Sequence, residues 1–289
     1  MSAMSTDVAI AVSDLRKRYG DLWAVNGVDL EVARGEIVAV LGPNGAGKTT
    51  ATEILEGYRH RDEGAVSVLG LDPERGDRAW RSRLGIVLQT SRDLGDLTVA
   101  ETVSHFAAYY PDPRSPEEVI ELVGLAEKSK ARNGQLSGGQ RRRLDVALGI
   151  IGRPELLFLD EPTTGFDPEA RRSFWGLIGS LRGEGTTIFL TTHYLDEAEA
   201  LADRVFVFSR GQVVASGPPE TLAGRHHGSA VVSWLEDGRR REEETATPTA
   251  LVAEVASRLG GEVPELLVTR PSLEDTYLAL IGSDEDVTA

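Results

Sequence analysis

The chain has 289 residues, of which 40% are hydrophobic and 27% are charged, a balance typical of a soluble globular protein of one or two domains. No stretch approaches the roughly 18 apolar residues of a membrane-spanning helix, and there is no cysteine for a disulfide, a thiolate metal site or a cysteine nucleophile. The formal net charge of −15 argues against a nucleic-acid partner, because surfaces that bind nucleic acid are normally basic.

A glycine-rich loop follows the first strongly apolar segment of the chain. Residues 37–41 are short, apolar and β-rich, which indicates a buried strand, and a helix is expected from Thr49. The glycines let successive N–H groups surround a phosphate, Lys48 can reach the β- and γ-phosphates, and the Thr49 hydroxyl can ligate Mg²⁺. The stretch therefore predicts a nucleoside triphosphate site. Its residues are Gly42, Pro43, Asn44, Gly45, Ala46, Gly47, Lys48, Thr49 and Thr50.

Two helices are predicted next by their N-terminal residues. Thr98 and Glu101 have the spacing of a capping box, which begins a helix expected to run to about Tyr110. Ser115 with Pro116 begins the following helix, because proline is favoured at the first helical position.

Two later stretches indicate what the nucleotide is used for. Ser137 and the glycines after it precede an amphipathic run at 141–150, so they predict a second helix start able to hold an anion. Residues 156–159 predict a buried strand that ends in Asp160 and Glu161, whose side chains point differently because side chains alternate along a strand. Asp160 suits the Mg²⁺ shell, and Glu161 suits orienting or deprotonating an attacking water.

The chain is expected to end in a small α/β accessory domain at residues 223–282, after a Gly-Pro-Pro boundary at 217–219. Ser272 is the predicted N-cap of its last helix, with Asp275 three residues on. The expected elements are a strand at 230–235, a charged turn through Glu244, a helix at 249–259, a strand at 266–269 and a helix at 272–281.

Taken in order, these motifs resemble the nucleotide-binding subunits of ATP-binding cassette (ABC) transporters, over roughly residues 8–222. Phe166 departs from the family, where leucine is commoner, but keeps an apolar side chain. The remaining matches are Tyr19 (the aromatic that stacks on adenine), Gln89 (Q-loop), Leu136, Ser137, Gly138, Gly139 and Gln140 (signature), Asp160 and Glu161 (Walker B), Asp167 (D-loop) and His193 (switch histidine).

The resemblance implies a P-loop NTPase fold with a RecA-like core, an antiparallel β-subdomain and a helical subdomain at about residues 93–145. It also implies ATP and Mg²⁺ as cofactors, and two copies that meet head to tail with Ser137 and Gly139 acting in trans. The implied catalytic residues are Glu161, His193, Gln89 and Lys48. The implied metal ligands are Thr49, Gln89 and Asp160.

The amino-acid sequences of three segments, 56–59, 191–198 and 271–275, are similar to those of the daunorubicin-resistance-like drug exporters of the ABC-2 type. That likeness implies a separate membrane permease, which would dock near Leu94 and Leu97. Because the first twenty residues lack a secretory signal, we expect a cytoplasmic protein held peripherally at the inner face of the membrane.

Other interpretations stay open at this point. Tyr19 could be an ordinary half-buried aromatic, Gln89 could cap a strand, and His193 could be structural. The chain could also serve an importer, which the motifs do not separate from an exporter. A soluble ABC ATPase of ribosomes or DNA is disfavoured by the single acidic cassette, and a regulator without turnover is disfavoured by Glu161. The sequence does not indicate which compound is transported, because that compound would contact the permease and not this chain.

Overall fold

The computed structural model describes residues 7–88, 95–222, 230–270 and 272–282. Contacts between Cα atoms divide the chain into two compact units, residues 1–214 and residues 215–289. We call them the cassette unit and the C-terminal unit. The division falls inside one strand, β9 (Gln212–Gly217), whereas the sequence predicts a boundary at residue 222, which stays a prediction.

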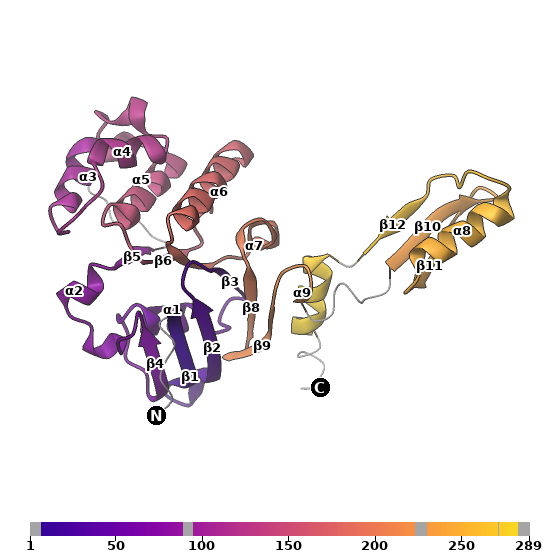
Figure 1. The fold of residues 1–289 in the computed structure, drawn as a ribbon, viewed down its shortest axis with the longest axis horizontal. Helices are drawn as coiled ribbons and strands as arrows, with labels where there is room; N and C mark the ends of the chain where they lie inside the picture. Colours follow the sequence, from indigo (N-terminus) through magenta and orange to yellow (C-terminus); the bar gives the residue numbers. More distant parts are fainter. Residues whose placement is uncertain (1–6, 89–94, 223–229, 271, 283–289) are drawn as a thin grey trace. The chain divides into compact units, whose positions relative to one another are not determined.

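A six-stranded sheet forms the centre of the cassette unit (Figure 1). Its strand order is β5-β6-β7-β3-β8-β9. The four pairings from β5 to β8 are all parallel. Their strands are short apolar runs that are almost wholly buried, as strands covered on both faces must be. The strand predicted at 37–41 is confirmed, whereas the strand predicted to end in Asp160 and Glu161 ends at Asp160, because Glu161 turns the chain with a positive φ. The bounds are β3 (Ile37–Leu41), β5 (Leu84–Val87), β6 (Leu156–Asp160), β7 (Thr187–Thr191) and β8 (Arg204–Ser209).

A second, antiparallel sheet has the order β2-β1-β4, and it provides the predicted β-subdomain. One hydrophobic core joins it to the parallel sheet and to α1, through buried side chains such as Ile10, Ile54 and Phe158. The glycine-rich loop at residues 42–49, the P-loop, lies against both sheets, with Gly47 next to Ala24 of β2 and Gly42 next to Phe208 of β8. The strands are β1 (Val8–Tyr19), β2 (Leu22–Ala33) and β4 (Glu63–Val68).

The helical region begins at the predicted capping box, where Glu101 N donates to Thr98 Oγ1 and Thr98 N donates to the Glu101 carboxylate. Its first helix ends at Ala107 rather than near Tyr110, because the next amides, including that of Tyr110, bond three residues back and tighten the last turn. The bounds are α3 (Val99–Ala107), α4 (Pro116–Leu122), α5 (Gly138–Ile150) and the short turns η2 (Ala126–Lys128) and η3 (Asn133–Gln135).

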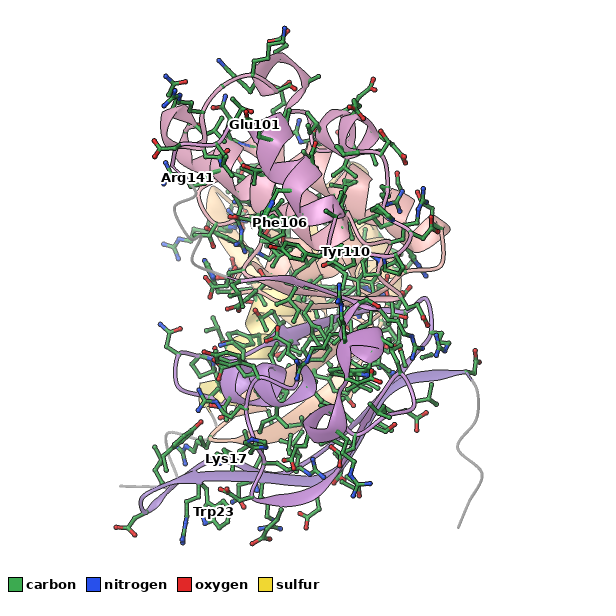
Figure 2. All side chains as sticks on the ribbon, turned by 90° about the vertical axis from the view of Figure 1, so that its left-hand side faces the viewer. Lys17, Trp23, Glu101, Phe106, Tyr110 and Arg141 are labelled. Atoms are coloured by element: carbon green, nitrogen blue, oxygen red, sulfur yellow. The ribbon has the colours of Figure 1, made fainter. Side chains whose placement is uncertain are left out.

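The antiparallel sheet and the helical region lie at opposite ends of the cassette unit. Figure 2 shows Lys17 and Trp23 at one end and Glu101 toward the other, with Phe106 nearer the middle. Within the described residues, no helix has the length and apolar character needed to cross a bilayer. The other helices of this unit are α1 (Lys48–Leu55), η1 (Pro73–Arg75), α2 (Arg78–Arg81), α6 (Pro168–Gly183) and α7 (Leu195–Leu201).

The C-terminal unit contains a small sheet of order β11-β10-β12 with its own core. Val232 and Trp234 of the sheet pack against Leu251 and Val255 of α8. Ser272 and Asp275 bond reciprocally at the start of the last helix, which confirms the predicted cap. The elements are β10 (Ala230–Glu236), β11 (Arg239–Thr245), α8 (Pro248–Leu259), β12 (Leu267–Thr269) and α9 (Leu273–Gly282).

The prediction of a charged turn through Glu244 is wrong, because residues 239–245 form the strand β11. Arg and Glu have little intrinsic preference for strands, but β11 pairs along its whole length with β10, from Ala230 opposite Thr245 to Glu236 opposite Arg239. The turn is only Asp237 and Gly238, both with positive φ, as a two-residue hairpin requires. Pairing with an apolar neighbour therefore overrides local propensity.

Candidate active site

Three adjacent parallel strands bring the predicted catalytic segments to one edge of the sheet. β7 lies between β6 and β3, with Asp160 opposite Thr191 and Thr191 opposite Val40. The P-loop follows β3, Glu161 follows β6 and His193 follows β7. Because ligands of α/β proteins gather at the carboxyl ends of parallel strands, this edge is the candidate active site.

The P-loop is packed so closely that two of its positions require glycine. A Cβ at Gly47, where φ is 100°, would lie 2.2 Å from Ala24 O, and a Cβ at Gly42 would lie 2.4 Å from Phe208 O. Gly47 is also the N-cap of α1, and in the described structure no side chain bonds to the N–H groups of that helix start. These N–H groups and the helix dipole form a binding site for an anion.

The Lys48 side chain folds back onto the first residues of the loop. Its ammonium donates to Gly42 O at 2.6 Å and to Pro43 O at 3.0 Å. Burial lowers the pKa of Lys48, and the negative charges of Glu161 and Asp160 act in the opposite direction. The ammonium is thus held among oxygen atoms, in reach of a negative group that enters the loop.

The Asp160 carboxylate is oriented by Thr191, whose hydroxyl donates to Asp160 Oδ1. Thr191 is 1% exposed, and its place on β7 is what sets it beside Asp160. The sequence analysis missed this residue, since only the strand order brings residues 160 and 191 together. The bond fixes one carboxylate oxygen and leaves the other available.

Glu161 has a backbone conformation that is rare outside glycine, with φ of 46°. Its N–H donates to Thr191 O at 3.0 Å, which holds the turn. Its carboxylate lies 3.4 Å from His193 Nδ1 and accepts from Thr164 Oγ1 at 3.4 Å. Strained residues of this kind are concentrated at functional sites, and here the carboxylate lies beside His193.

Arg142 is a second residue that the sequence analysis missed. It lies on α5, in the helical region, and is 6% exposed. Its guanidinium donates to three main-chain carbonyls, those of Leu88, Asp160 and Pro162. Burial lowers the pKa of Arg142, although four neighbouring carboxylates oppose that effect. One side chain therefore joins α5 to the end of β5 and to the segment that carries Glu161.

Glu197 on α7 is a buried carboxyl group that lies behind the site, with 0% exposure. Burial raises the pKa of Glu197, and the nearby polar side chains of Thr192, Thr163 and Trp175 oppose that rise. A lone Glu in an amphipathic helix gives no sign of such burial in the sequence. Thr192 precedes His193 and Thr163 follows Glu161 by two residues, so Glu197 lies close to both segments.

The predicted signature residues lie apart from these contacts, at the start of α5. Ser137 N and Gln140 Oε1 are 3.0 Å apart, and Gln140 N donates to Ser137 Oγ at 3.3 Å. Ser137 and Gly138 are exposed, and a Cβ at Gly138 would meet no heavy atom within 4 Å. Unlike Gly42 and Gly47, Gly138 is thus not required by packing within its own chain.

The remaining predicted residues have varied positions. Tyr19 ends β1 and is 42% exposed, with the Arg59 guanidinium 5.4 Å from its ring. Asp167 caps α6 by accepting from Ala170 N at 2.8 Å. Gln89 and Leu94 lie outside the described residues.

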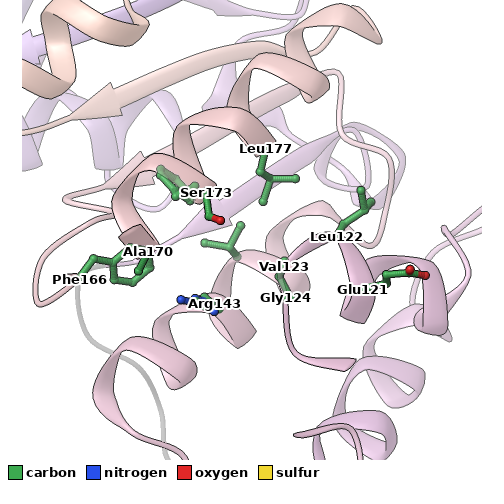
Figure 3. A pocket seen from close by; sticks show the side chains of 11 residues that line it. Glu121, Leu122, Val123, Gly124, Arg143, Phe166, Ala170, Ser173 and Leu177 are labelled. Carbon is green, nitrogen blue, oxygen red and sulfur yellow. The ribbon is translucent and has the colours of Figure 1, made fainter. Parts of the chain in front are cut away.

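A cavity of about 210 Å³ lies between α4, α5 and α6 (Figure 3). Leu122, Phe166 and Leu177 line it with apolar surface, and the Arg143 guanidinium lies 6.0 Å from the Phe166 ring. Phe166 itself is 8% exposed and packs edge to face on Phe174, so the expected apolar contact is confirmed. Of the predicted site residues in the described structure, none lines this cavity.

Comparison with known proteins identifies the family of the chain. The family model described as ABC transporter matches residues 25–164. The chain is 38% identical to the daunorubicin resistance ATP-binding protein DrrA3 of Streptomyces coeruleorubidus, over 97% of this chain and 98% of the relative. It is also 38% identical to the Nod factor export ATP-binding protein I of Rhizobium sp. (strain N33), over 96% of this chain and 98% of the relative.

Solved structures show the same fold. An ATP-binding subunit of an ABC transporter superimposes with a TM-score of 0.68 at 26% identity, covering 73% of this chain and 90% of that one. A dimeric bacterial ABC transporter cassette gives 0.65 at 26% identity, covering 72% and 98%. The fold and site thus define an ABC ATP-binding cassette. The chain belongs to the ATP-binding subunits of ABC transporters, among relatives of the daunorubicin-resistance and Nod-factor-export type, and it is an ATPase.

Proposed function

We propose that this chain hydrolyses ATP to power a separate ABC-2 type permease that exports a drug-like or other small hydrophobic compound. The observation that carries the proposal is the convergence of Lys48, Glu161 and His193 at adjacent strand ends, in a chain 38% identical to a daunorubicin resistance ATP-binding protein. The names of the two relatives above both describe resistance or export, which favours export over import.

ATP is held first by its phosphates. The N–H groups at the start of α1 and the Lys48 ammonium surround them, and Tyr19, exposed at the end of β1, stacks on the adenine. Thr49 is exposed at the start of α1 and Asp160 is half-buried at the end of β6, so a hydroxyl and a carboxylate are available for Mg²⁺ at the same edge of the sheet. The bound ion would neutralise charge on the phosphates. Gln89 is a further proposed ligand and catalytic residue.

Hydrolysis follows from the positions of Glu161 and His193. The Glu161 carboxylate accepts a proton from the water that attacks the γ-phosphate, or orients that water. His193, whose Nδ1 lies 3.4 Å from the Glu161 carboxylate, helps to orient the same water. Thr191 and Arg142 position the segment on which both carboxylates depend.

We further propose that two copies enclose ATP head to tail. The exposed Ser137 and Gly138 and the half-buried Gly139 of one copy then contact the phosphates bound by the other, and Asp167 lies at the contact. The open space around Gly138 supports this arrangement, since a glycine not required by its own chain leaves room for another molecule. Because ATP contacts both faces, only the ATP state favours closure.

Closure would move the permease. Leu97, which is 39% exposed, together with Leu94 lies in the segment proposed to receive a short helix of the permease, so the protein works at the inner face of the membrane. An acidic chain with a net charge of −15 is not suited to nucleic acid.

The variant Glu161→Gln tests the proposal. It removes the carboxylate and leaves Lys48 and Thr49 intact, so we expect ATP binding to persist while hydrolysis falls by about 100-fold or more, the range of general-base catalysis. Size-exclusion chromatography with Mg-ATP is expected to show a long-lived dimer.

Glu169→Gln is the matched control, because Glu169 is an exposed acid in the first turn of α6 and has no proposed role in hydrolysis. It should hydrolyse ATP at the rate of the unaltered protein. A Glu161→Gln protein that stayed monomeric and turned over ATP normally would refute the role given to Glu161.

A further inference from the structure

The longer free edge of the C-terminal sheet carries an unusual arrangement of charge. β11 is an outer strand, and its residues from Arg239 to Glu244 are all exposed. Three arginines are followed directly by three glutamates. The other edge, β12, has only three residues. An exposed edge strand offers unpaired N–H and C=O groups to another strand, and its charges decide which strand can bind.

Blocks of opposite charge make this edge complementary to itself in one orientation only. Two copies in parallel register would place arginine on arginine and glutamate on glutamate. Two antiparallel copies place the arginine block of one against the glutamate block of the other. Opposite charges facing each other across strands stabilise a pair, and like charges destabilise it.

Two-fold symmetry leaves two registers of β11 against its copy in which opposite charges face each other. A two-fold axis perpendicular to the sheet pairs odd-numbered residues with odd-numbered ones and even with even, which we call same-parity pairing. The reason is that facing side chains must lie on the same side of the sheet. With the axis at Arg241, Arg239 faces the partner's Glu243 and Arg240 faces the partner's Glu242. With the axis at Glu242, Arg240 faces the partner's Glu244 and Arg241 faces the partner's Glu243. Either register has four opposite-charge pairs and one like-charge pair on the axis.

We propose that β11 is a self-association edge, through which two copies of this chain pair their C-terminal sheets antiparallel into one continuous sheet of order β12-β10-β11-β11-β10-β12. The perpendicular axis keeps α8 of both copies on the same face of that sheet, so no helix has to be displaced. This contact requires no nucleotide, and it is therefore independent of the proposed ATP-dependent dimer.

The first test rearranges the charges without changing their number. Arg240→Glu with Glu243→Arg makes the six residues alternate in sign, so that same-parity pairing sets arginine on arginine and glutamate on glutamate in both registers. We expect the full-length chain, without nucleotide and with EDTA, to show a monomer–dimer equilibrium in sedimentation. In the variant the dissociation constant should rise at least about tenfold.

The control reverses both blocks, with Arg239, Arg240 and Arg241 changed to Glu and Glu242, Glu243 and Glu244 changed to Arg. Like the alternating variant, this one loses the bond from Arg240 to Ser233 Oγ, but it keeps the self-complementary order and opposite charges at positions 240 and 242. It should associate as the unaltered chain does. A monomeric unaltered chain, or equal association of the alternating variant, would overturn the proposal.

A cysteine cross-link locates the axis. The chain has no cysteine, so Arg241→Cys or Glu242→Cys can form a disulfide only between copies. On the axis, facing Cα atoms lie about 4.5–5.5 Å apart, within disulfide range. One of the two variants should cross-link on mild oxidation without nucleotide, whereas Arg239→Cys should not. Equal cross-linking of all three, or of none, would contradict antiparallel pairing of β11.

Discussion

At the scale of single residues, Arg142 connects parts of the cassette that are far apart in the sequence. Its guanidinium holds the carbonyls of Leu88, Asp160 and Pro162 together, so the helical region and the catalytic segment share one buried side chain. A movement of α5 would therefore be transmitted to the backbone on both sides of Glu161.

Arg142→Lys tests that connection. A lysine keeps the charge but cannot bond three carbonyls in a planar fork, so we expect hydrolysis to fall by about tenfold or more and stability to fall by about 1–3 kcal/mol. ATP affinity should change little, since Lys48 and Tyr19 are unaltered. The measurements are steady-state turnover, nucleotide titration and urea unfolding. Arg141→Lys is the neighbouring control, and equal behaviour of the two variants would show that Arg142 has no special role.

Glu56 at the end of α1 makes stability depend on pH. Burial, with Asp160 and Glu53 nearby, raises its pKa from 4.5 to about 8. Between these values the folded protein keeps a proton that the unfolded chain releases, so this group lowers the free energy of unfolding as pH rises from 4.5 to about 8. Below 4.5 both states are protonated and the loss disappears.

Glu56→Gln should remove this dependence. At pH 8, without nucleotide, we expect the variant to be more stable than the unaltered protein by up to a few kcal/mol, at about 1.4 kcal/mol per pKa unit, and the gain should shrink steadily toward pH 4.5. Urea unfolding over that pH range measures it. Glu31→Gln, at an exposed acid on β2, should give no such trend. A gain that did not vary with pH would exclude titration of Glu56 as the cause.

At the scale of elements, the C-terminal unit depends on a small core of its own. Val255 on α8 is 0% exposed and packs with Val232, Trp234 and Leu251. Because the cassette unit has a separate core, damage to this one should remain local.

Val255→Ala should therefore lower only one of two thermal transitions. Loss of two buried methyl groups and the cavity left behind destabilise such a core by about 1–3 kcal/mol. Calorimetry of the full chain measures both transitions, and addition of Mg-ATP identifies the cassette by raising its transition. Glu254→Ala, at an exposed position of the same helix, should leave both unchanged. Equal shifts of both transitions in Val255→Ala would show that the units unfold as one.

Elements with strong local signals were predicted well and the others were not. The capping boxes at Thr98 and Ser272 lie in the residues next to the helices that they begin, so sequence alone reveals them. The strand β11 could not be predicted from its own residues, because Arg and Glu become a strand here only through pairing with β10.

At the scale of the whole molecule, shared sites between two copies can be tested by mixing variants. Ser137→Arg blocks the signature and Lys48→Ala removes the phosphate ligand, so each homodimer should be inactive. A mixed dimer has one site with both lesions and one site with neither. With random pairing we expect about one quarter of normal ATPase activity, since half of the dimers are mixed and one of their two sites is intact. Complete inactivity of the mixture would show that each chain hydrolyses ATP with its own signature.

The sequence by itself determined the chemistry, because the P-loop, the signature and the Asp160–Glu161 pair are contiguous motifs whose residue types follow from phosphate and water chemistry. The tertiary structure decided what surrounds that chemistry. Thr191 reaches Asp160 because β7 lies between β6 and β3, and Arg142 reaches three carbonyls from another part of the fold. Such contacts depend on strand order and on packing between distant segments, which no local pattern of residues encodes.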